Sequence, residues 1–359
     1  MPQSRYAIVL GAGLTQFSVI GLFFAYGLFF KSFEVEFGWS RTLMSSVSAM
    51  AVFMMGALAA LAGRLADRFG PRPVLLASGL LYGLGYALIS QITAPWQMFL
   101  LFGTLLGAGL STHDVVTLST VARWFEKKRG IMSGVVKVGT AFGQITLPPL
   151  AAILIVTYGW RSAAVILGVG AGIVLVAAAL LMSHPRSPSA SGAPVPRTGT
   201  DFATARKSRL FWTLCAIQFL FFPAVIGIPM HIAVHGMDLG MTSGGAAALL
   251  SVIGGASIAG RLAVGTLVDR IGGKLAMLFC LFVLMLSLAS LVVAMTPLSL
   301  YVVLAAYGFA HGGMFTVVSP TVAGYFGMRA HGAIFGAVLF SGNFGGAIGP
   351  IQKKIECAH

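Results

Sequence analysis

Charged residues are scarce in this chain. They make up 9% of its 359 residues, and only nine side chains are acidic, whereas a typical soluble domain is about 25% charged. Hydrophobic residues make up 57%, and the mean hydropathy is +0.92. This composition excludes a soluble globular domain, a disordered chain, a collagen and a coiled coil. We therefore predict an all-α polytopic membrane protein, with the lipid bilayer as its surroundings.

Cysteine and enzyme motifs are also lacking. The three cysteines, Cys215, Cys280 and Cys357, have neither the number of a disulfide framework nor the spacing of a metal site. The sequence contains no G-x-S-x-G, no P-loop and no H-E-x-x-H. We predict no metal, no cofactor and no enzymatic activity, and the missing nucleotide loop argues against a primary pump.

Apolar segments of membrane-spanning length recur along the chain, separated by short polar breaks. About 20 apolar residues are needed per span. The predicted spans are 6–30, 42–62, 74–92, 97–122, 131–157, 162–182, 209–235, 242–264, 275–295, 298–322 and 332–351. The stretch 183–208 is rich in Pro, Ser, Gly and Arg, which indicates a flexible linker. We predict a six-helix bundle over 1–182, a cytoplasmic linker over 183–208 and a five-helix, incomplete bundle over 209–359.

Basic residues dominate the charge, with 23 Lys and Arg and a net charge of +14. In a soluble protein this excess would indicate nucleic-acid binding. Here, placing the N-terminus inside puts 16 basic residues in inner segments and 5 in outer ones. Because cytoplasmic loops of membrane proteins carry the excess of Lys and Arg, we predict that the N-terminus and the linker are cytosolic, in a cell membrane. No nucleic-acid partner is expected.

An internal repeat relates the two halves. Residues 63–72 read GRLADRFGPR, and residues 265–274 read GTLVDRIGGK, at an offset of 202. The paired positions are Gly63, Asp67, Arg68, Gly70 and Arg72 in the first copy, and Gly265, Asp269, Arg270, Gly272 and Lys274 in the second. Parallel repeats of this kind indicate a transporter of two bundles with its site at their interface.

The repeated pattern G-x-L-x-D-R-x-G-x-R/K resembles the signature loop of the major facilitator superfamily. The resemblance implies a major facilitator fold of two six-helix bundles, a monomer, and a gating or structural role for the signature-loop residues. The runs FGWSR (37–41), RWFEKKRG (123–130) and GWR (159–161) resemble the monocarboxylate porter and oxalate/formate antiporter branch. Members of the superfamily have twelve spans. Here about eleven are predicted, and the chain ends with IQKKIECAH, so a truncated, non-transporting membrane protein is one alternative hypothesis.

Among the ionisable residues inside predicted spans are His113, Asp114, Lys137, Arg261 and His311. Such residues indicate function by default, because charge inside the membrane is costly. Counting at 1.5 Å per residue places Asp114, Lys137 and Arg261 each about 12 Å from the cytosolic boundary, and His311 nearer the midplane. We predict that they share one polar cavity.

Arg261 is the strongest candidate for binding substrate. It aligns, through Arg261-x-x-x-Gly265, with the span-eight arginine that binds the substrate carboxylate in the resembled branch. A guanidinium suits a carboxylate because it offers a planar bidentate fork. The alternative is that Arg261 only latches the signature loop. Lys137 and His311 are further substrate-binding candidates.

Departures from the resembled branch bear on the substrate. The span-eleven lysine of oxalate transporters aligns with Val338, the first span has no lysine, and Ser257 stands where animal porters have an acid. A second cation for a dicarboxylate is therefore missing, unless Lys137 supplies it. This favours a singly charged organic anion.

Asp114 and Lys137 allow two interpretations. They form either a buried ion pair that fastens the fourth and fifth spans, or a pair that opens on protonation, with Asp114 and His113 coupling transport to protons. Gln16, Gln144, Gln218 and Asn343 are expected to join helices rather than bind ligand. The predicted function is secondary transport of a small, monocarboxylate-like anion by alternating access, coupled to protons or to anion exchange. The alternative transport activity is efflux of a hydrophobic compound.

Overall fold

The structure is a computed structural model that describes residues 4–183 and 199–356, with the side chains of 347–356 and four other residues left out. The linker positions 184–198 and Cys357 lie outside the described residues. Every described element is helical, apart from an isolated bridge between Gly199 and Gly327. The prediction of an all-α chain is confirmed. The helices are α1 (Arg5–Ala25), η1 (Tyr26–Phe29), α2 (Phe30–Phe37), α3 (Arg41–Phe69), α4 (Pro71–Leu88), η2 (Ile89–Gln91), α5 (Pro95–Leu101), η3 (Phe102–Leu106), α6 (Gly107–Trp124), α7 (Arg129–Leu181), α8 (Phe202–Ala205), α9 (Arg209–Asp238), α10 (Ser243–Ile271), α11 (Gly273–Val293), α12 (Pro297–Phe326) and α13 (His331–Glu356).

Within the described part of the chain, nine helical runs are long and apolar enough to cross a membrane. One of them, α7, has 53 residues and breaks at Gly159, whose φ of 77° and ψ of 158° lie outside the helical region. The break occurs at a glycine because glycine adopts this backbone conformation without steric cost. The two parts of α7 correspond to the fifth and sixth predicted spans. With α13 as the last, each predicted apolar segment has a helical counterpart, although α7 covers two segments and the fourth is divided among α5, η3 and α6.

The signature loops are mostly helical. We expected the second and eighth spans to end at 62 and 264, but α3 continues to Phe69 and α10 to Ile271. Each helix stops at a glycine with positive φ, 91° at Gly70 and 84° at Gly272. The next helix begins at once, with Pro71 at the start of α4 favouring that start. The end of the molecule that carries Gly70 and Gly272 is called the signature-loop end below.

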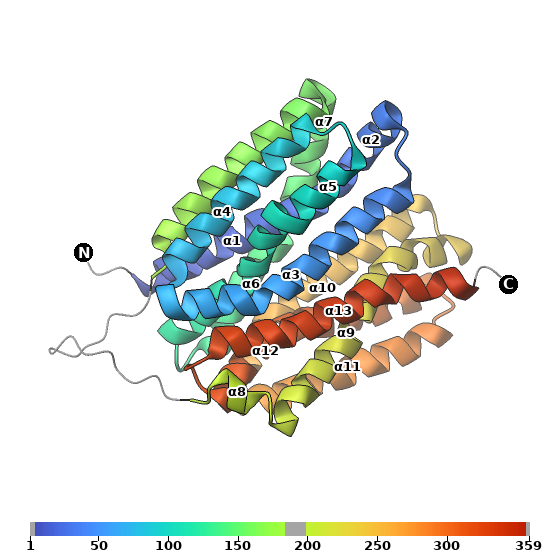
Figure 1. The fold of residues 1–359 in the computed structure, drawn as a ribbon. Helices are drawn as coiled ribbons and strands as arrows, with labels where there is room; N and C mark the ends of the chain where they lie inside the picture. Colours follow the sequence, from blue (N-terminus) through green and yellow to red (C-terminus); the bar gives the residue numbers. More distant parts are fainter. Residues whose placement is uncertain (1–3, 184–198, 357–359) are drawn as a thin grey trace.

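Two groups of helices lie side by side in Figure 1, α1–α7 in blue to green and α9–α13 in yellow to red. They meet where α3 packs against α13 and where α7 packs against α10. Near the signature-loop end the backbones touch through glycine. A Cβ added at Gly63 would overlap the carbonyl of Gly332, and one added at Gly130 would overlap the carbonyl of Gly265. At the opposite end, the tips of α2 and α7 diverge from the ends of α9 and α13 (Figure 1).

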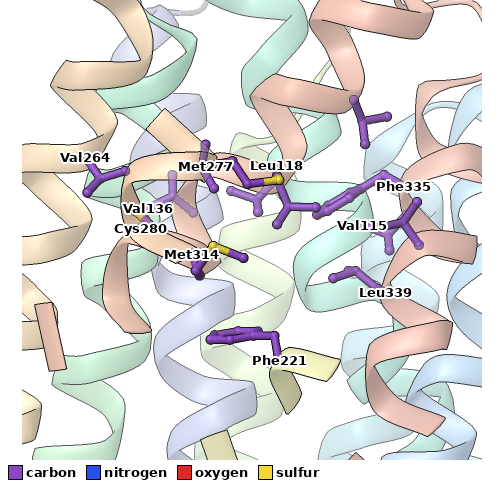
Figure 2. Close-up of a cluster of buried hydrophobic side chains, with 14 of the residues drawn as sticks. Val115, Leu118, Val136, Phe221, Val264, Met277, Cys280, Met314, Phe335 and Leu339 are labelled. Atoms are coloured by element: carbon purple, nitrogen blue, oxygen red, sulfur yellow. The ribbon is translucent and has the colours of Figure 1, made fainter. Parts of the chain in front are cut away.

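An apolar cluster fills the space between the two groups toward the signature-loop end. Figure 2 shows side chains from both groups meeting there. The labelled members are Val115 and Leu118 of α6, Val136 of α7, Phe221 of α9, Val264 of α10, Met277 and Cys280 of α11, Met314 of α12, and Phe335 and Leu339 of α13. Because buried apolar side chains exclude water, this cluster closes the signature-loop end to polar solutes.

Gly63→Ala is expected to weaken this closure. The added methyl group would meet the main chain of Gly332, which cannot move away as a flexible side chain could. Overpacking costs about 1–3 kcal/mol, so alkylation of a cysteine introduced at buried Ala333 should become about tenfold faster. Gly13→Ala is the matched control, because a Cβ there meets nothing within 4 Å. Equal labelling rates in the two variants would contradict the expectation.

Candidate functional site

A buried polar network joins α1, α6 and α7. Asp114 and Lys137 are 7% and 3% exposed, and the Lys137 ammonium forms an ion pair with Oδ1 of Asp114. Gln16 Nε2 donates to the same carboxylate oxygen at 2.7 Å and to the carbonyl of His113 at 3.0 Å, while Thr140 donates to Gln16 Oε1 at 2.8 Å. Three helices of one group are therefore tied together around a single carboxylate.

His113 lies beside the same carboxylate. Its Nδ1 is 2.5 Å from the carbonyl of Leu110, and its Nε2 is 3.4 Å from Oδ2 of Asp114. A carbonyl oxygen only accepts, so Nδ1 carries a proton and donates it to Leu110. The other ring nitrogen, Nε2, faces Asp114. Two titratable groups, predicted from the sequence as neighbours, thus face each other inside the helix bundle.

Arg261 reaches this network from the other group of helices. It is 3% exposed on α10, and its Nη1 donates to the main-chain carbonyl of Lys137 at 2.8 Å. Its Nε has no hydrogen-bond partner among the described residues. The predicted convergence of Asp114, Lys137 and Arg261 is therefore present, although Arg261 contacts the backbone of Lys137 rather than the carboxylate.

His311 joins the site through aromatic rings. The half-buried imidazole stacks on Tyr307, with centroids 5.7 Å apart, and stands at right angles to Phe315 at 5.1 Å. The Lys137 ammonium lies 5.2 Å from the centroid of Phe315, a distance suited to a cation–π contact. Tyr307 and Phe315 were not among the residues singled out from the sequence. The four-residue spacing of Tyr307, His311 and Phe315 on one helix face was the signal that could have found them.

The electrostatic balance of the site follows from these contacts. One carboxylate, Asp114, lies with two cations, Lys137 and Arg261, and none of the three is more than 7% exposed. The layer therefore carries an excess of one positive charge in a region of low dielectric constant. Such a site favours one negative charge on a ligand, and the unpaired Nε of Arg261 offers it a donor.

The signature-loop residues make structural contacts. Asp67 pairs with Arg123 of the same group, whereas Asp269 accepts from the backbone N–H groups of Gly130 at 2.7 Å and Ile131 at 2.9 Å. The Asp269 contact places an anion at the N-terminus of α7, where the helix dipole favours it, and links the two groups. In addition, Arg72 donates to the carbonyls of Leu180 and Met182, while Arg68, Arg270 and Lys274 are exposed near the ends of their helices.

His331 is a bridging residue that sequence reasoning missed. Its fully buried ring has Nδ1 3.0 Å from Ser119 Oγ on α6 and Nε2 3.0 Å from the carbonyl of Ser319 on α12. It therefore joins the two groups of helices near the signature-loop end. No sequence signal marked it, because it falls at the very edge of a predicted span.

No group of three or more His, Cys, Asp or Glu side chains that could hold a metal ion occurs within residues 4–183 and 199–356. The site is thus a set of organic donors and charges contributed by α6, α7, α10 and α12.

Comparison with known proteins adds the family. The model of the Major Facilitator Superfamily matches residues 12–350. Among similar proteins, monocarboxylate transporter 13 of Rattus norvegicus is 28% identical over 354 residues, covering 96% of this chain and 80% of the relative. Monocarboxylate transporter 11 of Homo sapiens is 27% identical, covering 92% and 72%. Among solved structures, the transporter FucP in the outward conformation superposes with a TM-score of 0.72 at 17% identity, covering 99% of this chain and 93% of FucP.

Proposed function

Since the chain belongs to the major facilitator superfamily, we propose that it carries a small organic monoanion of the monocarboxylate type across the membrane by alternating access. It is a multi-pass integral membrane protein and a transporter rather than an enzyme. Its fold is the major facilitator fold. Our proposal concerns the substrate, the residues that bind the substrate, and the coupling of its transport.

The charge of the buried layer is the observation that carries this proposal. Lys137 pairs with the only carboxylate of the layer among the described residues, and Arg261 contacts the main chain of Lys137, so a ligand with a single negative charge completes the balance. A second cation at position 338, which would suit a dicarboxylate, is replaced by the buried apolar Val338. Two relatives named as monocarboxylate transporters support the same substrate class.

The mechanism we propose is rocking of the bundle 1–182 against the bundle 209–359 around this layer. Support comes from the close glycine contacts and the apolar cluster at the signature-loop end, together with the divergence of the helices at the opposite end. With the N-terminus in the cytosol of a cell membrane, the closed end faces the cytosol. Transport is coupled to protons through Asp114 and His113, or to exchange against a counter-anion, and the monomer is the working unit.

Flux measurements test the function. The purified full chain in proteoliposomes is expected to take up labelled lactate or formate saturably, driven either by a pH gradient, acid outside, or by anion loaded inside. Empty liposomes are the control. Stimulation by the gradient alone would indicate proton coupling, and stimulation by internal anion alone would indicate exchange. Absence of anion-dependent flux under both conditions, with export of a hydrophobic dye instead, would contradict the proposal and favour efflux of hydrophobic compounds.

A further inference from the structure

Several buried polar atoms around the site have no hydrogen-bond partner among the described residues. In the second group of helices these atoms are Gln218 Nε2, Ser257 Oγ, Arg261 Nε, His311 Nδ1 and Asn343 Oδ1. A buried polar group without a partner is unfavourable and needs an explanation. Gln16, in the first group, is the contrast, because its amide is bonded to four partners. We expected Gln16 and Gln218 to play the same joining role, but their surroundings differ.

Gln218 faces the interior beside the aromatic side of the site. It is 2% exposed on α9, and Phe221 and Phe222 lie one turn further along the same face. The Phe221 ring is 6.2 Å from His311 and 5.6 Å from Phe315, measured between centroids. The amide therefore lies on the same wall of aromatic side chains that His311 completes.

The main chain of α13 comes close to Gln218. A Cβ added at Gly342 would lie 3.3 Å from the Gln218 Cβ and closer still to the ring of Phe222. The helix packing thus holds Gln218 in place without giving its Nε2 an acceptor. A donor that is fixed, buried and unpaired is suited to a ligand that enters from the site.

Gln218 and Arg261 lie at about the same distance from the signature-loop end of the molecule. Gln218 is nine residues from the start of α9 at Arg209, and Arg261 is ten residues from the end of α10 at Ile271. At 1.5 Å per residue, both lie about 14–15 Å from the signature-loop ends of their helices. A small anion held by its carboxylate at Arg261 can therefore direct its remaining atoms toward α9 at the same level.

We propose that Gln218 binds a second oxygen of the transported anion and so selects monocarboxylates that carry a keto or hydroxyl oxygen. This inference rests on the proposed function. The unpaired Nε2 of the Gln218 amide donates to that oxygen. A carboxylate that lacks the oxygen leaves this donor unpaired, and such sites reject the deficient analogue strongly.

Pyruvate and propionate are the matched probes, because they share a three-carbon skeleton and differ in the keto oxygen. In proteoliposomes of the full chain, kcat/KM is expected to be at least about tenfold higher for pyruvate than for propionate. In Gln218→Leu and Gln218→Met, which keep the volume and remove the amide, this ratio should fall about tenfold. Gln91→Leu, at an exposed glutamine of η2, is the control and should keep the wild-type ratio.

Two outcomes would overturn the inference. A wild-type ratio near one contradicts it regardless of whether the variants fold. A parallel loss of both substrates in the Gln218 variants, with a lowered melting temperature and an unchanged ratio, means that Gln218 only packs between helices. Absence of flux for every monocarboxylate in the wild-type protein contradicts the proposed function instead, so the two failures are distinguishable.

Discussion

Arg261→Ala is expected to abolish carboxylate transport, with uptake reduced at least about a hundredfold, because we propose its guanidinium as the bidentate donor to the substrate. Arg261 is buried, and the unpaired Nε lies in a layer whose charge is already positive. Removing it leaves Lys137 paired to Asp114 and no cation for the substrate. The measurement is the initial rate of labelled anion uptake into proteoliposomes, normalised to the amount of folded protein.

Arg261→Lys and Arg206→Ala sharpen this test. The lysine keeps the charge and loses the planar fork, so KM should rise by about tenfold while some transport remains. Arg206 is an exposed arginine outside the spans, and its replacement should change nothing. Because Arg261 also bonds the carbonyl of Lys137 across the two groups of helices, thermal stability must be measured alongside. Normal transport by Arg261→Ala would mean that this contact is its whole role.

Asp114→Leu is expected to destabilise the folded protein by about 3–5 kcal/mol, because it leaves the Lys137 ammonium buried without its partner. The stabilising contact with Gln16 is lost at the same time. The change should appear as a large drop in melting temperature and in the yield of monodisperse protein. A variant as stable as wild type would contradict the buried ion pair.

The double variant Asp114→Leu, Lys137→Leu separates the two interpretations of this pair. Removing both charges from an apolar interior should return stability close to that of wild type. If the pair only fastens α6 to α7, uptake will still respond to a pH gradient. If the pair carries the proton, the response to the gradient will disappear. The exposed pair Lys31–Glu34, 3.5 Å apart, is the control, because removal of both its charges should be nearly silent.

The fold was largely readable from composition and hydropathy. In lipid, every backbone polar group must be satisfied within its own segment, so apolar runs of about 20 residues can only be spanning helices. All the predicted runs became helices, and only their ends moved. The chain continued helically through Asp67 and Asp269 because nothing interrupts a helix there before Gly70 and Gly272.

Depth within the membrane was also readable, because helical rise converts sequence distance into position along the helix. Counting therefore placed Asp114, Lys137 and Arg261 in one layer, and the structure brings them together there. Sequence distance does not show how a helix is rotated about its axis or which helix lies beside it. The rotation and the neighbours of a helix depend on which small residues meet, and nothing in the sequence marks Gly332 as the residue that Gly63 contacts.

Tertiary packing therefore set the partners. It paired Asp114 with Lys137, turned Arg261 to the main chain of α7, and gave Gln16 a full set of hydrogen bonds. It left Gln218 Nε2 without a partner, and placed His331 between the two groups of helices. The physical reason is that a spanning sequence specifies a helix and its depth locally, whereas the contacts of a buried side chain are specified by residues as far as 212 positions away.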